Sequence, residues 1–189
     1  MTTLASNALC TRLQLKTYLN VNQADATYDN LCHEIINRIS QAFENYCGRQ
    51  FKVQDIVEYH DGNVRALFPD QYPINSVTEI REDSDWVWGS ETIIDSSDYR
   101  IMDSKYIIYD GFFTSGEGAI KLTYNAGYTD VPADLVQACI EECGRKMKHR
   151  NDYDESVKTL GDGSVSYIAS EFLPQTKMTL NSYRYYAGI

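Results

Sequence analysis

Acidic side chains close to a cation are the candidates for catalysis in this sequence of 189 residues. Asp70 follows a run typical of a β-strand, and Glu79 and Arg81 lie on the next such run. Magnesium-dependent nucleases use two carboxylates beside a cation to hold the ion and activate water. Arg81 stands where such sites usually carry a lysine, and a guanidinium cannot act as a base because it stays protonated. A magnesium-dependent nuclease is therefore an alternative only, and we predict that the protein is not an enzyme.

The other reactive residue types lack the spacing that their reactions need. The three histidines have no serine or cysteine partner in a nucleophile motif, and the Gly-x-Gly stretches at 116–118 and 161–163 lack the Lys-Ser/Thr of a phosphate-binding loop. The five cysteines are an odd number and form no CxxC pair, so we expect neither a disulfide framework nor a zinc site. We predict no metal, no cofactor and five buried free thiols: Cys10, Cys32, Cys47, Cys139 and Cys143.

Charge is distributed unevenly along the chain, whose net charge is -10. Residues 51–131 carry six basic and fifteen acidic side chains, whereas residues 1–50 carry four of each. Binding to nucleic acid by phosphate neutralisation needs clustered Lys and Arg, so residues 51–131 cannot form such a surface. No stretch approaches the roughly 18 apolar residues of a membrane span, and residues 1–9 do not resemble a secretory signal. We expect synthesis in the cytoplasm and no membrane contact.

Helical periodicity appears at both ends of a central β section, which predicts an α+β fold with a small helical bundle core. Apolar residues at spacings of three and four predict a short helix over 11–19 and long helices over 27–48 and 132–150. Gly48 provides a left-handed stop for the second helix, and Pro132 suits the first turn of the third.

The intervening β insertion, residues 51–128, alternates apolar and polar residues over several short runs. Asp61-Gly62 is a favoured turn, so we predict a hairpin between the runs around Val57 and Ala66. A second hairpin is predicted between 99–102 and 106–109, with further strands around Val77 and Ile80 and over 120–124. Trp86, Val87 and Trp88 lie beside Gly89 at a predicted loop tip.

Residues 152–189 form a predicted C-terminal arm with few apolar residues, which ends in a short helix over 174–187. Tyrosine is frequent in this chain, with fifteen copies, and Tyr183, Tyr185 and Tyr186 crowd the end of the arm. Tyrosine is enriched at interfaces because its ring offers a large rigid contact and its hydroxyl a hydrogen bond. We therefore expect the arm to pack against another polypeptide.

Five short motifs, in this order and spacing, resemble those of the head-to-tail connector proteins of tailed phages, also called adaptor or head-completion proteins. They are Leu13–Leu19, Tyr46–Phe51, Pro73–Val77, Leu122–Tyr128 and Val131–Leu135. The resemblance covers about residues 10–150, and the tail from 152 onward matches loosely. The motif residues to which it assigns structural roles are Lys16, Tyr18, Leu19, Tyr46, Arg49, Tyr124, Gly127, Tyr128 and Pro132.

The resemblance implies a connector core over residues 1–151 with the arm over 152–189, assembled as a homo-oligomeric ring, typically a dodecamer, in the virion neck. Such a ring docks on the portal protein, extends the DNA channel and carries a stopper or tail protein. The acidic β section would let DNA pass without specific binding. The loop of Trp86 and Trp88 is expected to contact a neighbouring ring. A β-rich surface or fibre-associated module that uses these tryptophans as a ligand platform is a second alternative. The residues expected at the portal or subunit interface are Leu173, Pro174, Leu180, Tyr183, Arg184, Tyr185 and Tyr186.

Overall fold

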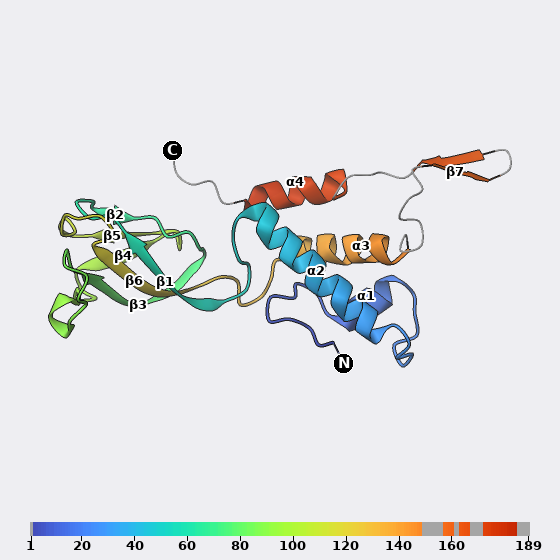
Figure 1. Ribbon diagram of the computed structural model, residues 1–189, viewed down its shortest axis with the longest axis horizontal. Helices are drawn as coiled ribbons and strands as arrows, with labels where there is room; N and C mark the ends of the chain where they lie inside the picture. The colour runs from blue at the N-terminus through green and yellow to red at the C-terminus, as the bar shows by residue number, and fades with distance from the viewer. Residues whose placement is uncertain (1, 149–156, 161–162, 167–171, 185–189) are drawn as a thin grey trace. The chain divides into compact units, whose positions relative to one another are not determined.

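The computed structural model describes residues 2–148, 157–160, 163–166 and 172–184 and divides them into two compact units (Figure 1). The helical unit comprises the described residues up to Arg49 and from Val131 onward, and the β unit comprises Gln50–Asp130. The β unit is therefore an insertion between two helices, as the sequence predicts. None of the helices in the described ranges combines the length and the hydropathy of a membrane span.

The helical unit contains α1 (Arg12–Tyr18), α2 (Asp29–Cys47), α3 (Ala133–Lys148) and α4 (Pro174–Tyr183). Thr11 forms a capping box with Gln14 at the start of α1, and Gly48 ends α2 in the left-handed conformation at φ 67°. Pro132 directly precedes α3, and its carbonyl accepts a hydrogen bond from the Val136 N–H. These local signals explain why the bounds of the first three helices lie within one or two residues of the predicted ones.

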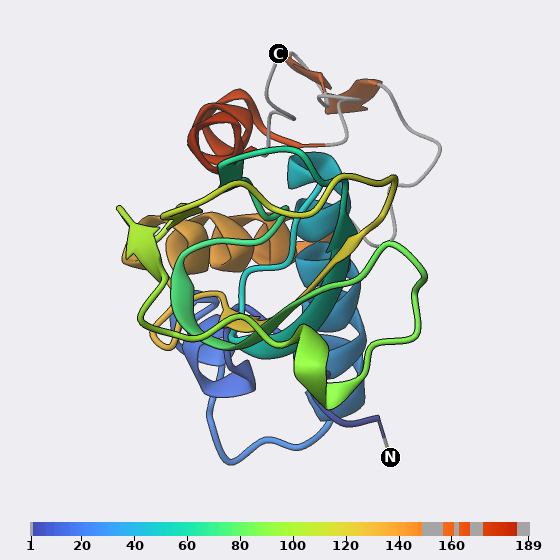
Figure 2. The same ribbon diagram turned by 90° about the vertical axis from the view of Figure 1, so that its left-hand side faces the viewer.

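Helices α2 and α3 contact each other, and each also contacts α1 and α4, so this pair is the common element of the helical unit; Figure 2 shows the same helices from a second side. The buried face of α2 repeats at helical spacing and includes Ile36, Ile39 and Phe43. Helix α4 lies against α2 and α3, with Leu180 fully buried. Phe172, just before α4, meets the Phe43 ring edge-on with 5.2 Å between ring centroids. The described end of the predicted arm therefore packs on the helices of its own chain.

The predicted arm also contains an antiparallel strand pair, β7 (Val157–Leu160) and β8 (Gly163–Ser166), in which Leu160 lies opposite Gly163. The sequence indicated no regular structure over these residues. The short helix at the end of the chain begins at Pro174 as predicted, but α4 ends at Tyr183 and not at 187.

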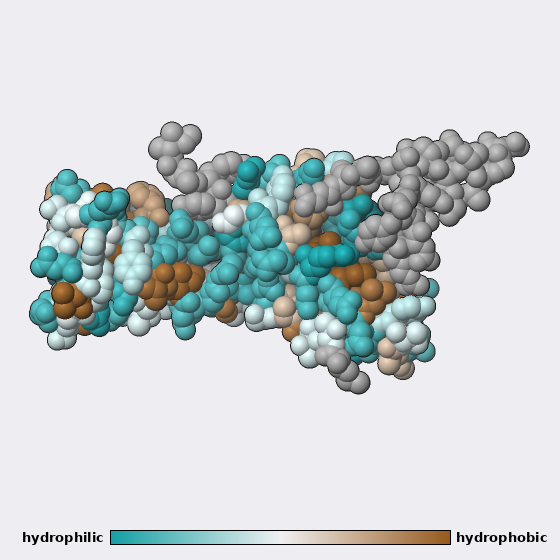
Figure 3. All heavy atoms as spheres, in the orientation of Figure 1, coloured by the Kyte–Doolittle hydropathy of each residue, from teal (hydrophilic) through white to brown (hydrophobic). Residues whose placement is uncertain are grey.

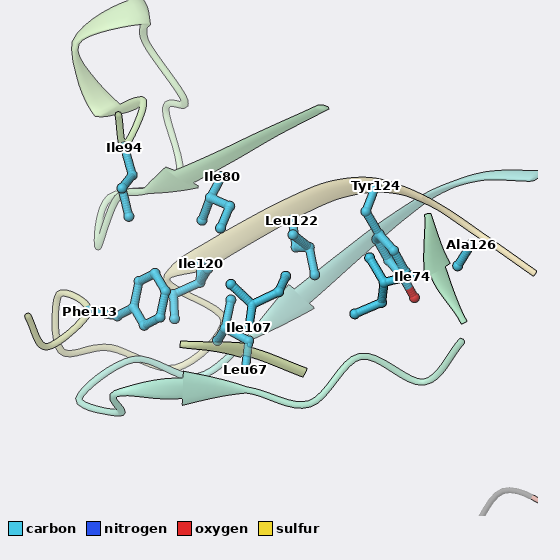
Figure 4. Packing of buried hydrophobic residues seen from close by; sticks show 10 residues of the cluster. All are labelled: Leu67, Ile74, Ile80, Ile94, Ile107, Phe113, Ile120, Leu122, Tyr124 and Ala126. Carbon is cyan, nitrogen blue, oxygen red and sulfur yellow. The ribbon is translucent and has the colours of Figure 1, made fainter. Parts of the chain in front are cut away.

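Two three-stranded antiparallel sheets build the β unit, with strand orders β1-β6-β3 and β2-β5-β4. They face each other across a core in which Leu67 and Ile107 of one sheet meet Ile120 and Leu122 of the other (Figure 4). The strands are β1 (Gln54–His60), β2 (Ala66–Leu67), β3 (Ile74–Glu82), β4 (Tyr99–Met102), β5 (Tyr106–Tyr109) and β6 (Ile120–Ala126), and a 3-10 turn, η1 (Ser90–Thr92), follows β3.

The hairpin predicted around Asp61-Gly62 is wrong. β1 pairs with β6, so that Gln54 lies opposite Ala126, and β2 pairs with β5. The two residues instead form a corner: the Asp61 carboxylate accepts the Gly118 N–H at 2.8 Å, and a Cβ on Gly62 would lie 1.6 Å from the Thr114 carbonyl oxygen. Glycine is thus required at 62 by the close approach of another loop.

The second predicted hairpin is confirmed. β4 and β5 pair with Tyr99 opposite Tyr109 and Met102 opposite Tyr106. The turn residues Asp103 and Ser104 have φ values of 51° and 54°, which is the backbone twist of a two-residue hairpin loop.

Candidate functional site

The loop after β3, residues 83–92, is called the aromatic loop here because it displays Trp86 and Trp88. The Asp83 carboxylate organises it by accepting the backbone N–H groups of Asp85, Val87 and Trp88 at 2.8, 3.0 and 2.9 Å. The N–H groups of Asp85 and Trp88 lower the pKa of Asp83, burial opposes this shift, and the Val87 N–H adds to it. Asp83 is therefore a charged anchor within the loop.

Arg81, which carries the opposite charge to Asp83, holds the same loop. Its guanidinium donates to the carbonyl oxygens of Trp88 at 2.6 Å and Gly89 at 3.0 Å, and it pairs with the Glu79 carboxylate at 2.9 Å. The Asp83 carboxylate thus binds backbone N–H groups of the aromatic loop, and the Arg81 guanidinium binds its backbone carbonyl groups. Together they fix the backbone of this short segment.

This network supports an unusual backbone. Trp86 and Trp88 both have a φ of 57°, in the left-handed region that large side chains rarely adopt. Residues held in sparsely populated backbone conformations concentrate at functional sites, where surrounding contacts maintain them. The aromatic loop is therefore built to hold two indole rings in fixed positions.

The two tryptophans line a shallow hollow of about 370 Å³ together with Tyr59 of β1 and Gly118. The rings of Tyr59 and Trp88 lie 5.8 Å apart at 52°, and the Trp86 indole N–H donates to the Glu117 carbonyl at 3.2 Å. Trp86 is 61% exposed and Tyr59 58% exposed. Rigid aromatic surface that remains open to solvent is a typical protein-binding feature.

Exposed apolar side chains are concentrated on the β unit in general. Among the described residues, eleven of the fourteen large hydrophobic side chains that are exposed belong to it, including Val87 at 76%, Phe112 at 70% and Phe68 at 65%. Figure 3 shows hydrophobic side chains, in brown, at the surface of this unit at the left of the view. Exposed apolar side chains in this number make the β unit a candidate interaction surface.

The predicted interface residues on α4 have mixed positions. Leu180 is fully buried within the chain, so the prediction that its side chain contacts a partner is corrected. Its carbonyl also accepts a hydrogen bond from the Cys47 thiol at 3.4 Å. Phe172 and Leu180 face inward against the helices of the same chain, whereas Met178 of α4 is exposed.

Neighbours of Leu180 are tied to the same helices. The Leu173 N–H donates to the buried Glu142 carboxylate at 2.6 Å, and Glu142 pairs with Arg145 at 2.8 Å. The Tyr183 hydroxyl bonds Asp134 at 2.8 Å, and the Arg184 guanidinium lies 5.7 Å from the centre of the Tyr46 ring.

These intrachain contacts still leave part of α4 at the surface. Pro174 and Arg184 are exposed, Leu173 and Tyr183 are half-buried, and Tyr185 and Tyr186 lie outside the described residues. A role of these residues at a portal or subunit interface stays a prediction.

The family model for head completion proteins matches residues 8–186. The chain belongs to the head completion protein family. This match confirms the resemblance predicted from the motifs and, with it, a structural role in connecting head and tail. No curated protein sequence matches the chain.

Solved structures show the same fold. A chain of the neck of an empty GTA particle computed with C6 symmetry aligns over 100% of this chain and 96% of its own at 15% identity, with a TM-score of 0.62. A chain of the virion of a native gene transfer agent (GTA) particle covers 100% and 95% at 14% identity, with a TM-score of 0.64. The neck of the native GTA particle computed with C12 symmetry contains a third such chain, which covers 100% and 95% at 14% identity with a TM-score of 0.60.

Motif residues in the helical unit of this head completion protein have structural tasks. Lys16 is buried, pairs with Asp29 and donates to the carbonyl oxygens of Asp25 at 2.6 Å and Gln23 at 3.3 Å. A buried ammonium needs such partners, so Lys16 fixes the loop between α1 and α2. The Leu19 N–H closes α1 on the Leu15 carbonyl, and the Tyr46 hydroxyl donates to Asn181 at 2.9 Å.

Two further residues complete this packing. Tyr18 rests on α3, where a Cβ on Gly144 would lie 2.8 Å from its ring. Gly144 was missed by the sequence analysis because a glycine inside a helix carries no signal of what crosses it. Arg49, which directly follows the glycine that ends α2, is buried.

Motif residues in β6 and directly after it organise the β unit. The Tyr124 ring is fully buried, and its hydroxyl donates to Glu58 at 2.5 Å and accepts the Gln71 N–H at 3.2 Å. Gly127 has a φ of 112°, and a Cβ there would lie 2.5 Å from the Lys52 carbonyl oxygen. The Tyr128 N–H donates to the Phe51 carbonyl at 2.7 Å, which pairs the segments that enter and leave the unit.

Glu58 is the centre of a hydrogen-bonded group on β1. Burial on its own would raise the pKa of Glu58, but hydrogen bonds from His60, Tyr124 and the Asp70 N–H outweigh burial and lower it. Burial and the neighbouring Glu58 carboxylate raise the pKa of Tyr124. The pair therefore consists of a charged carboxylate and a neutral phenol.

The residues of the nuclease alternative serve other purposes. Arg81 and Glu79 hold the aromatic loop, and the Asp70 backbone donates to Glu58 at 3.2 Å. Within the described ranges, neither Asp70 nor Glu79 belongs to a cluster of three or more potential metal ligands. These contacts give the nuclease alternative no support, whereas the family match supports a structural role.

All five cysteines are free and buried, as predicted. Three of them meet in the helical unit, where the Cys139 sulfur lies 3.7 Å from that of Cys10 and 4.0 Å from that of Cys143. The contact with Cys10 and burial raise the pKa of Cys139, and burial raises the pKa of Cys47 to about 11. Neutral thiols in contact behave as small apolar side chains. Their meeting could not be read from the sequence, because Cys10 is distant from α3 along the chain.

Proposed function

We propose that this protein is a subunit of a ring in the virion neck, and that the surface of its β unit makes the contacts which join successive rings. Membership of the head completion family supports the connector role. The observation that carries the choice of surface is the concentration of exposed apolar side chains on the β unit, eleven of fourteen among the described residues. Chains of the same fold come from GTA necks that were computed with C6 and C12 symmetry, which supports a ring.

The ring docks on the portal protein on one side and carries a stopper or tail protein on the other. In this arrangement the exposed residues of α4, Pro174 and Arg184, together with Leu173 and Tyr183 and with Tyr185 and Tyr186 beyond them, face the portal or a neighbouring subunit. When each subunit uses one surface to bind a different surface of the next subunit, the assembly closes by forming a ring. A dodecamer is the expected size of this ring.

The acidic β section extends the DNA channel. Most of its acidic side chains are exposed, and they outnumber basic ones by fifteen to six over residues 51–131. A negative wall repels the phosphate backbone, so DNA passes without specific binding. The membership of a structural head completion family favours this role over a fibre-associated ligand module.

The test is complementation of particles that lack this protein, with electron microscopy as the readout. We expect particles without it to be DNA-filled heads that have no tails, and wild-type protein to restore tails. A variant with Trp86→Ser and Val87→Ser should fold but restore few tails, because it removes exposed contact area. Leu13→Ser, an exposed apolar position on α1 at 51% and outside both proposed contact surfaces, is the control. Normal virions in the absence of the protein would overturn the proposal.

A further inference from the structure

We propose that the hollow between Tyr59, Trp86 and Trp88 binds the guanidinium of an arginine side chain, presented by a basic segment of the neighbouring neck protein. The identity of that neighbour rests on the proposed function. The chemistry of the occupant does not, because it follows from the walls and the rim of the hollow.

The walls are aromatic and fixed. Tyr59 projects from β1, and Trp88 lies 5.8 Å from it, ring centroid to ring centroid. Trp86 is held through its indole N–H on the Glu117 carbonyl at 3.2 Å. A planar guanidinium stacks on such faces and is attracted by their negative quadrupole, most strongly on tryptophan.

The rim is acidic. The Asp61 carboxylate accepts the N–H of the lining residue Gly118 at 2.8 Å, and the exposed residues Asp85 and Glu117 directly precede the lining residues Trp86 and Gly118 in the sequence. None of the four lining residues is basic. Two of the described cations lie near the hollow. Arg81 is engaged with two carbonyl groups and Glu79, and its hydrogen bond lowers the pKa of that carboxyl. Lys121, which lies opposite Tyr59 in β6, is close enough to Glu79 to lower the same pKa further. Charge complementarity therefore selects a cationic side chain over an apolar or acidic one.

The hollow is already formed before anything binds. Asp83 and Arg81 hold Trp86 and Trp88 at a φ of 57° through five hydrogen bonds to the backbone of the aromatic loop. Binding to such a site loses little conformational entropy, so it can be specific despite its small area. Lysine would gain the charge but not the stacking of a planar group.

The chain has only two tryptophans, and both lie in this loop, so intrinsic fluorescence and two indole N–H resonances report on this site alone. The probes are the peptides Ac-Gly-Arg-Gly-NH2 and its citrulline analogue, which keeps the shape and removes the charge. We expect the arginine peptide to shift both indole resonances and to bind at least about five-fold more tightly than the citrulline peptide, with a loss of affinity as salt rises.

Variants locate the effect. Tyr59→Leu, and separately Asp85→Asn combined with Glu117→Gln, should each weaken the arginine peptide several-fold. Phe112→Leu, an exposed aromatic position outside the hollow, should leave binding unchanged. Equal binding of the two peptides, no shift of either indole resonance, or no effect of Tyr59→Leu would overturn the inference. These results leave the complementation test untouched, so a failure here and a failure of the ring proposal are distinguishable.

Discussion

The two units of this protein treat apolar surface in opposite ways. Among residues 2–49, 131–148 and 172–184 of the helical unit, the large hydrophobic side chains are buried or half-buried except for those of Leu13, Tyr18 and Met178. The β unit exposes eleven, although it has a core of its own. The difference teaches that the helical unit covers its apolar side chains mainly through contacts within the chain, whereas the β unit keeps apolar surface that another chain can cover.

The largest expected effect on stability tests whether α4 packs on the helical unit in solution. Leu180→Ala should lower the free energy of unfolding by about 3 kcal/mol, because it removes a fully buried side chain and leaves a cavity. Urea unfolding followed by far-UV circular dichroism measures this loss. Met178→Ala on the same helix should change stability by less than about 0.5 kcal/mol. Equal effects of the two changes would show that α4 is detached in solution.

The next effect concerns the core of the β unit. Tyr124→Phe should cost about 1–2 kcal/mol, because the Glu58 carboxylate loses a hydrogen bond and the Gln71 N–H loses its acceptor. The same urea titration applies. Tyr59→Phe, which alters an exposed ring, is the control. If Tyr124→Phe left the free energy of unfolding unchanged, a water molecule would have to replace the lost hydroxyl group.

A smaller effect should appear with pH. Since the pKa of Glu58 is lowered in the folded protein, its contribution is fully present above about pH 4.3, the ordinary value for glutamate, and is lost as the pH falls through the folded value. The urea midpoint of wild type should fall over this range more steeply than that of Glu58→Gln. Parallel curves for the two proteins would contradict this assignment.

The smallest effect on stability is expected for an exposed apolar side chain of the β unit. Phe112→Ser should change the free energy of unfolding by less than about 0.5 kcal/mol, because the ring is 70% exposed. Differential scanning calorimetry of the full chain measures it. A loss above about 1 kcal/mol would show that the ring is covered in solution, and the contrast between the units would weaken.

Local signals in the sequence were sufficient for some elements and not for others. Helices α1, α2 and α3 and the β4–β5 hairpin could be predicted because each depends on residues close together in the chain. The partner of β1 could not, since Gln54 and Ala126 pair across most of the β unit. Asp61-Gly62 does change the direction of the chain, but it forms a corner that lets the Thr114 backbone approach closely, and it does not join two paired strands.

The candidate site was predicted only in part for the same reason. The sequence indicated Trp86 and Trp88 at a loop tip, but Tyr59 joins them only through the long-range pairing of β1 with β6. The arm was predicted to pack against another polypeptide because its apolar residues are few. Phe172 and Leu180 are nonetheless enough to seat α4, since α2 and α3 supply the rest of the contact.

The paired segments around Lys52 and Tyr128 act as a stem through which the chain enters and leaves the β unit. Gly127 lets the two backbones close, and the Val53 N–H bonds the Tyr128 carbonyl at 3.3 Å. A stem closed in this way makes everything beyond it a replaceable cassette. The β unit could therefore be exchanged for another insertion with the same two ends while α2 and α3 keep their sequence.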